Sequence, residues 1–110
     1  MKDRRVFLQH LGECLTKIRE YTVEGRDAFL SDGKTQDAVI RNLEIVGQIV
    51  RDLGPETLAA QRPEVPWVRI AGARNILAHQ YLGVDVALVW NIVEHDLGVL
   101  EIAIIGLLRE

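Results

Sequence analysis

The stretch TQDAVIRNLEIVGQIVRDLG, Thr35 to Gly54, decides the fold class of this chain. Its apolar residues recur every three or four positions, which places them on one face of an α-helix. They are Val39, Leu43, Val46, Val50 and Leu53. A polar stripe lies on another side of the helix and consists of Asp37, Arg41, Glu44 and Gln48. The spacings of these residues suit side-chain pairing along a helix. The pattern predicts a long amphipathic helix that is capped by Thr35 and stopped by Gly54.

Helical spacing also precedes and follows this stretch. Leu8 to Ile18 predicts a first helix with Asp3 as its cap, and Phe29 is expected to anchor the connector to the core. Pro55 and Pro66 are each expected to open a helix, because proline is tolerated in the first helical turn. In the second of these helices, glycine offers a close-packing point at Gly72.

The last helix is predicted to begin at an Asp85 cap and to run to about Leu107 in one piece. Four of its apolar residues lie outside the main stripe: Ile92, Val99, Ile102 and Ile105. This surplus indicates a subunit interface, so we expect a homodimer. Together the patterns predict an all-α bundle of four to five helices in a single domain, residues 1–110.

Composition indicates the cellular compartment that we expect for this bundle and the partners that its charge favours. The single cysteine, Cys14, is typical of a reducing compartment, and the N-terminus lacks the apolar core of a signal peptide. The most apolar run, Leu97 to Leu108, is too short to span a bilayer. We therefore expect a cytoplasmic protein without a membrane segment. A net charge of −3 gives no general attraction to nucleic acid, so any such contact requires a local basic patch.

The motif RNILAHQY, Arg74 to Tyr81, concentrates the chemically useful side chains. Asn75 and His79 are one turn apart, whereas Arg74 and His79 are separated by roughly 140° on an ideal helix. Either the helix ends near His79 and turns, or the two side chains meet a common target with help from a second copy. Both alternatives place the motif at the edge of a cleft.

This motif favours general-base ribonuclease chemistry. A histidine can remove a proton from a ribose 2′-hydroxyl while an arginine stabilises the phosphate, so His79 and Arg74 are the candidate catalytic residues. Asn75, Arg41 and Glu44 are candidate supporting residues. The alternatives are an inert histidine at a helix end and an exposed salt-bridged face. No zinc-ligand spacing and no glycine-rich phosphate loop is present, so we expect neither a metal site nor a cofactor.

Four strings, in this order, give the chain its resemblance to a known family: TQDAVIRNLEIVGQ, PEVPW, RNILAHQY and GVDVALVW. The chain resembles the HepT-like family of HEPN-domain toxins over nearly its whole length. The family's Arg-x-x-x-x-His-x-Tyr pattern is matched by Arg74, His79 and Tyr81, with Asn75 after the arginine.

The resemblance implies a helical homodimer whose two motifs face a shared cleft. It also implies a metal-independent ribonuclease toxin that cleaves RNA. The implied partner is an MntA-type nucleotidyltransferase antitoxin, which adenylylates Tyr81. Two alternatives remain open: a non-catalytic helical binding subunit of a nucleotidyltransferase complex, and a purely structural dimerisation bundle.

Overall fold

Helices make up the secondary structure wherever the chain is described. The computed structural model describes residues 3–79, 83 and 85–110, which form seven helices and no strand. In chain order the helices are α1 (Arg4–Tyr21), α2 (Arg26–Leu30), α3 (Gly33–Leu53), α4 (Pro55–Gln61), α5 (Trp67–His79), α6 (Val86–His95) and α7 (Leu97–Leu108). The all-α prediction is confirmed. Five of these helices have ten or more residues, whereas α2 and α4 are short helices of 5 and 7 residues in the connecting segments.

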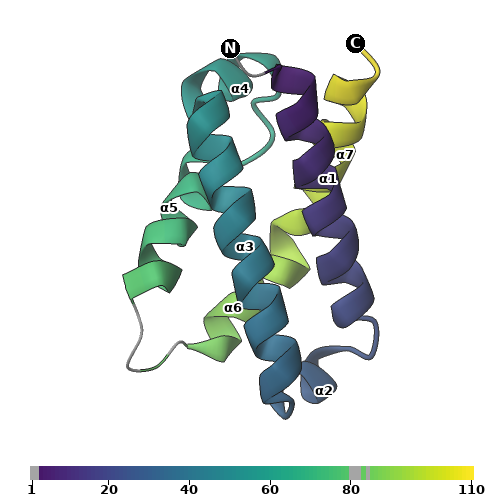
Figure 1. Cartoon of the computed structure of the whole chain (residues 1–110), viewed down its shortest axis with the longest axis vertical. Coiled ribbons are helices and arrows are strands. Elements are labelled where there is room, and N and C mark those ends of the chain that lie inside the picture. The colour runs from purple at the N-terminus through teal and green to yellow at the C-terminus, as the bar shows by residue number, and fades with distance from the viewer. Residues whose placement is uncertain (1–2, 80–82, 84) are drawn as a thin grey trace.

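α3 is the central helix, because it packs against both α1 and α5 (Figure 1). The predicted stripe is buried at Val39, Leu43, Val46 and Val50, while Leu53 packs at the edge of the core. Gly54 has a φ of 94°, a conformation that favours glycine, and it ends α3 where Pro55 begins α4. This part of the prediction is confirmed.

The start of α3 differs from the prediction, because its cap is Asp32 and not Thr35. The Asp32 carboxylate accepts hydrogen bonds from the backbone N–H groups of Lys34 at 3.1 Å and Thr35 at 3.4 Å. Thr35 lies within the first turn, and its hydroxyl donates to Asp32 at 2.8 Å. These hydrogen bonds, the Thr35 hydroxyl first, lower the pKa of the Asp32 carboxyl. A carboxylate satisfies two of the exposed N–H groups at a helix start, which explains why aspartate prevails.

The connector before α3 is attached to the core as expected. α2 buries Phe29, whose ring centroid lies 5.4 Å from that of Trp90 on α6. Near the other end of the bundle, the buried Trp67 donates its indole N–H to the Arg62 carbonyl at 2.8 Å, which holds the bend before α5. The first contact joins α2 to α6, and the second joins the start of α5 to the end of α4.

The predicted single last helix is wrong, because it is divided at Asp96 into α6 and α7. Asp96 is buried, and its carboxylate accepts two hydrogen bonds from Arg69 of α5, at 2.6 Å and 3.2 Å. A buried carboxylate requires such a partner, and the break between α6 and α7 coincides with that pairing.

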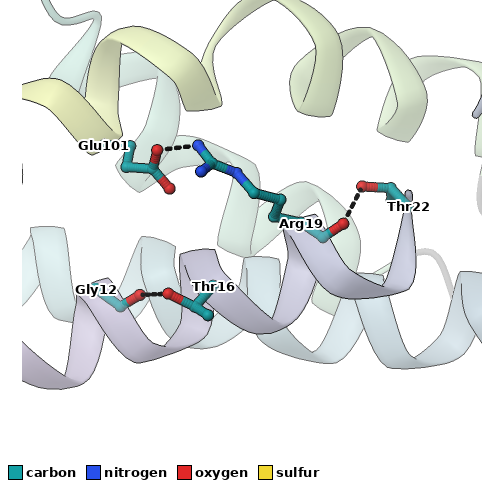
Figure 2. A network of polar contacts seen from close by, with 5 residues as sticks. All are labelled: Gly12, Thr16, Arg19, Thr22 and Glu101. Atoms are coloured by element: carbon teal, nitrogen blue, oxygen red, sulfur yellow. Dashed lines mark hydrogen bonds and ion pairs between the residues drawn. The ribbon is translucent and has the colours of Figure 1, made fainter.

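α1 and α7 lie side by side at the surface (Figure 1). Arg19 of α1 forms an ion pair with Glu101 of α7 (Figure 2). Along the same stretch of α1, the Thr16 hydroxyl donates to the Gly12 carbonyl at 3.1 Å. The Arg19 side chain is largely exposed, so this pair contributes little to stability.

The surplus apolar surface is smaller than the sequence suggested. Ile92 and Val99 are half-buried and pack against the core, whereas Ile102 is 72% exposed and Ile105 is 45% exposed. The unpartnered apolar residues of α7 are therefore Ile102 and Ile105. Within the described ranges, no helix combines the length and apolar character needed to cross a membrane.

Candidate active site

α5 carries the RNILAHQY motif and is described up to His79, its last residue. Trp67, Ile70 and Leu77 are buried, and Ala73 is half-buried, so the predicted core side of this helix is confirmed. Arg74 lies next to that side and is half-buried. The cation is thus placed at the seam where α5 meets α3.

Gly47 makes this seam unusually close. A Cβ atom at Gly47 would lie 2.8 Å from the Arg74 Cβ atom and 3.0 Å from the Ile70 carbonyl oxygen. Only a glycine allows the α3 and α5 backbones to approach in this way. The predicted close-packing point at Gly72 is wrong, since among the described residues no atom outside the neighbouring residues and backbone of α5 lies within 4 Å of a Cβ there. The signal for Gly47 was its place within the apolar stripe of α3.

Arg74 borders a cavity of about 210 Å³ along α3. Its other lining residues come from α3 and are Arg41, Glu44, Ile45, Gln48 and Ile49. The structure therefore brings two of the predicted supporting residues, Arg41 and Glu44, together with Arg74. Arg41 and Glu44 form an ion pair with 3.8 Å between a guanidinium nitrogen and a carboxylate oxygen.

Asn75, the third predicted supporting residue, contacts two arginines. Its side-chain oxygen accepts hydrogen bonds from Arg74 and from Arg51 of α3, each at 3.4 Å. Neither guanidinium has a carboxylate oxygen within 4 Å in the described part of the chain. Sequence reasoning missed Arg51, although it lies three residues after Gln48 on the polar stripe of α3.

The remaining predicted site residues are His79 and Tyr81, at the end of the motif. The backbone of His79 ends α5, but its side chain lies outside what the structure describes. Tyr81 lies outside the described residues altogether. The pairing of Arg74 with His79 and the position of the Tyr81 phenol therefore stay predictions.

A family model agrees with the motif and the fold. The model described as "Ribonuclease HepT-like" matches residues 11–105, which include α3, α5 and the seam between them. This chain belongs to the ribonuclease HepT-like family. The resemblance inferred from its sequence strings is thereby confirmed.

Several relatives of this HepT-like chain carry ribonuclease names. A candidate RNase of Methanocaldococcus jannaschii is 42% identical over 93 residues, covering 84% of this chain and 76% of the relative. A probable ribonuclease HepT of Thermococcus cleftensis is 38% identical over 97 residues, covering 87% of each. A gamma-glutamylcyclotransferase and candidate RNase of M. jannaschii is 36% identical over 110 residues. That match covers 99% of this chain but only 49% of the relative. No solved structure is significantly similar.

A larger hollow separates α5 from α6 in the HepT-like bundle. Its volume is about 420 Å³, and apolar side chains such as Ala73, Leu77 and Ile92 form most of its wall. The ion pair of Arg69 with Asp96 lies at its border. The half-exposed Leu88 also borders it, so an apolar surface adjoins the motif-bearing helix.

Proposed function

We propose that this chain is a metal-independent endoribonuclease and the toxin of a toxin–antitoxin pair that acts in the cytoplasm. Membership in the ribonuclease HepT-like family and relatives named as RNases support ribonuclease function. The observation that carries the proposal is the state of Arg74. Its backbone and Cβ atom lie at a tight helix seam beside a cavity, and in the described residues its guanidinium contacts a neutral amide but no carboxylate.

In this proposal Arg74 and His79 are the catalytic residues. His79 removes the proton from a ribose 2′-hydroxyl, and the 2′-oxygen attacks the adjacent phosphorus. The bond from phosphorus to the 5′-oxygen breaks, and the departing oxygen takes up a proton. The products are a 2′,3′-cyclic phosphate and a 5′-hydroxyl end. Arg74 stabilises the negative charge that builds on the phosphate oxygens in the transition state.

Three further residues support Arg74. Asn75 limits the positions available to its guanidinium. Arg41 adds a second positive charge to the cavity, and Glu44 holds Arg41 in place through their ion pair. Because Glu44 offsets the charge of Arg41, the charged residues of this cavity sum to +1, in a chain whose net charge is −3.

We further propose that the active form is a homodimer whose two motifs share a cleft. The exposed Ile102 and Ile105 of α7 and the apolar hollow beside α5 supply surfaces that a second copy would cover. Light scattering at micromolar concentration should give twice the mass of one chain. A stable monomer would remove the shared-cleft mechanism.

Regulation is proposed to act on Tyr81 through an MntA-type nucleotidyltransferase. The tyrosine oxygen attacks the α-phosphorus of ATP, pyrophosphate leaves, and the phenolic proton is lost. The added phosphodiester brings negative charge and a bulky base near the motif, where it competes with RNA for Arg74. Incubation with the cognate enzyme and ATP should add AMP-sized mass to the wild type but not to Tyr81→Phe. Additions that persist in Tyr81→Phe would exclude this switch.

RNA cleavage by purified protein tests the catalytic proposal. Cleavage should persist with a chelator, yield 2′,3′-cyclic phosphate ends, and disappear in His79→Ala. Equal cleavage by His79→Ala would contradict the assignment. A dimer that binds the nucleotidyltransferase but never cleaves RNA would be a helical binding subunit instead.

A further inference from the structure

Arg51 lies in the last turn of α3 and faces the motif from the opposite helix. Its guanidinium donates to the Asn75 side-chain oxygen at 3.4 Å, and Arg74 donates to the same oxygen at the same distance. One guanidinium nitrogen of each arginine thus lies 3.4 Å from the same oxygen, which brings the two guanidinium groups close together. Two permanent cations thus converge on one uncharged acceptor.

Among the arginines that lack a carboxylate partner in the described part of the chain, Arg51 and Arg74 converge on one acceptor, whereas Arg4 and Arg5 donate to separate acceptors. Within residues 3–79, 83 and 85–110, carboxylates pair with Arg19, Arg26, Arg41, Arg62 and Arg69. Over the same residues, no carboxylate oxygen lies within 4 Å of a guanidinium nitrogen of Arg51 or Arg74. An amide oxygen does not neutralise two guanidinium groups. An anion placed between them would relieve their repulsion and gain two charge-assisted contacts.

The present contacts leave the arginines free to bind such an anion. Hydrogen bonds of 3.4 Å are long and weak, so turning a donor from Asn75 toward a ligand costs little. Each guanidinium has five N–H donors in a planar fork, and the described contacts occupy one nitrogen of each. Arg51 is exposed, which leaves its remaining donors accessible.

We propose that Arg51 and Arg74 form a two-arginine clamp for one phosphodiester group of RNA. Each guanidinium binds one non-bridging oxygen, and Asn75 acts as the spacer that keeps the two groups apart. This inference rests on the proposed ribonuclease function and adds Arg51 as a substrate-binding residue. A merely structural role for Arg51, in which it stabilises the C-terminal end of α3, would not depend on RNA.

The test measures binding of a single-stranded 2′-O-methyl oligonucleotide, which lacks the proton needed for cleavage, over a range of salt concentrations. Arg51→Gln should bind roughly 10-fold more weakly than the wild type, as expected when one charge-assisted hydrogen bond is removed. The slope of log K against log salt should become shallower by about 0.7, because one arginine no longer neutralises a phosphate. Arg51→Lys should keep most of the slope while binding more weakly, because it keeps the charge but not the fork.

The matched control is Arg26→Gln, which removes the same charge from α2. Arg26 lies beside Asp27, and α2 is at the opposite end of α3 (Figure 1). Its affinity and salt slope should equal those of the wild type. Melting curves of all variants establish that they are folded.

The outcomes separate this inference from the proposed function. If Arg51→Gln binds with the affinity and slope of the wild type while the wild type cleaves RNA, the clamp is wrong and the ribonuclease proposal stands. If Arg51→Gln weakens binding but no protein cleaves RNA, the clamp stands and the ribonuclease proposal fails. If the wild type does not bind the oligonucleotide, the clamp is overturned, and the RNA cleavage assay decides the ribonuclease proposal.

Discussion

Arg69 and Arg74 lie five residues apart on α5, and their guanidinium groups meet very different surroundings. Arg69 donates two hydrogen bonds, at 2.6 Å and 3.2 Å, to the buried carboxylate of Asp96. Those hydrogen bonds, together with the attraction to Asp96, raise the pKa of Arg69. Arg74 donates one long hydrogen bond to the neutral Asn75, in the described part of the chain.

The difference separates a structural arginine from one that is available for a ligand. Asp96 satisfies Arg69, and the pair ties α5 to the junction of α6 and α7. Arg74 is positioned by the backbone contact at Gly47, so its guanidinium is not needed to hold the helices together. The proposed function requires an arginine without a carboxylate partner. A guanidinium already paired with a carboxylate would have to give up that partner to bind phosphate.

The largest effect is expected when Arg74 is given the kind of partner that Arg69 has. Asn75→Asp places a carboxylate of the same size against Arg74 and Arg51, which should pair with both and lower their combined charge from +2 to a net +1. We expect the rate of RNA cleavage to fall about 100-fold, the decrease typical when one transition-state donor is removed. A cleavage assay with melting curves checks this. An Asn75→Asp protein with the wild-type rate would mean that the charge on Arg74 does not matter.

The reciprocal change gives Arg69 a neutral partner. Asp96→Asn leaves an amide facing the Arg69 donors in a buried position, so the melting temperature should drop by several degrees while cleavage per folded molecule is retained. Glu101→Gln is the control, because it breaks the exposed pair with Arg19 and should change the melting temperature little. Equal decreases in the two variants would remove the distinction between the buried carboxylate of Asp96 and the more accessible carboxylate of Glu101.

The tight seam itself can be tested with two glycines. Gly47→Ala should destabilise the protein by about 1–2 kcal/mol, because the new methyl group collides with Arg74 and the α5 backbone. Gly72→Ala should stabilise it by about 0.5–1 kcal/mol, since the site is open and alanine favours a helix. Chemical denaturation measures both values. Stabilisation by Gly47→Ala would show that the helices can separate without cost.

The smallest effect is expected for Arg74→Gln on stability. No carboxylate depends on Arg74 among the residues described, and glutamine keeps the Cβ and Cγ atoms at the seam. The free energy of unfolding should therefore change by no more than about 0.5 kcal/mol. Denaturation curves of Arg74→Gln and the wild type should nearly coincide, and a large decrease in stability would assign Arg74 a structural role.

The sequence was sufficient to predict the long helices. It was insufficient where a helix boundary depends on contacts with residues far away in the chain. The stripe of α3 identified its buried face, because helical periodicity is local. Its start was misassigned since both Asp32 and Thr35 are cap residues and the stripe begins only at Val39. The break at Asp96 was missed because apolar spacing continues through it, whereas the partner that holds its carboxylate, Arg69, is 27 residues away.

At the candidate site, the sequence likewise identified residues that belong to local patterns and missed residues whose role depends on contacts between helices. The motif itself identified Arg74 and Asn75, and the polar stripe of α3 identified Arg41 and Glu44, which share a cavity with Arg74. Arg51 could not be selected, because its contact with Asn75 joins two helices and residues 24 apart in the chain. Gly47 was missed because its significance lies in the neighbouring backbone of α5.

The role of the Arg74 guanidinium in RNA cleavage is tested by comparing Arg74→Lys with Arg69→Lys under identical conditions. Both variants keep one positive charge and lack the planar fork of arginine. We predict that Arg74→Lys cleaves RNA at least about 100-fold more slowly than the wild type, whereas Arg69→Lys stays within about twofold at a temperature where both are folded. Wild-type cleavage by Arg74→Lys, or an equal decrease in Arg69→Lys, would contradict this prediction.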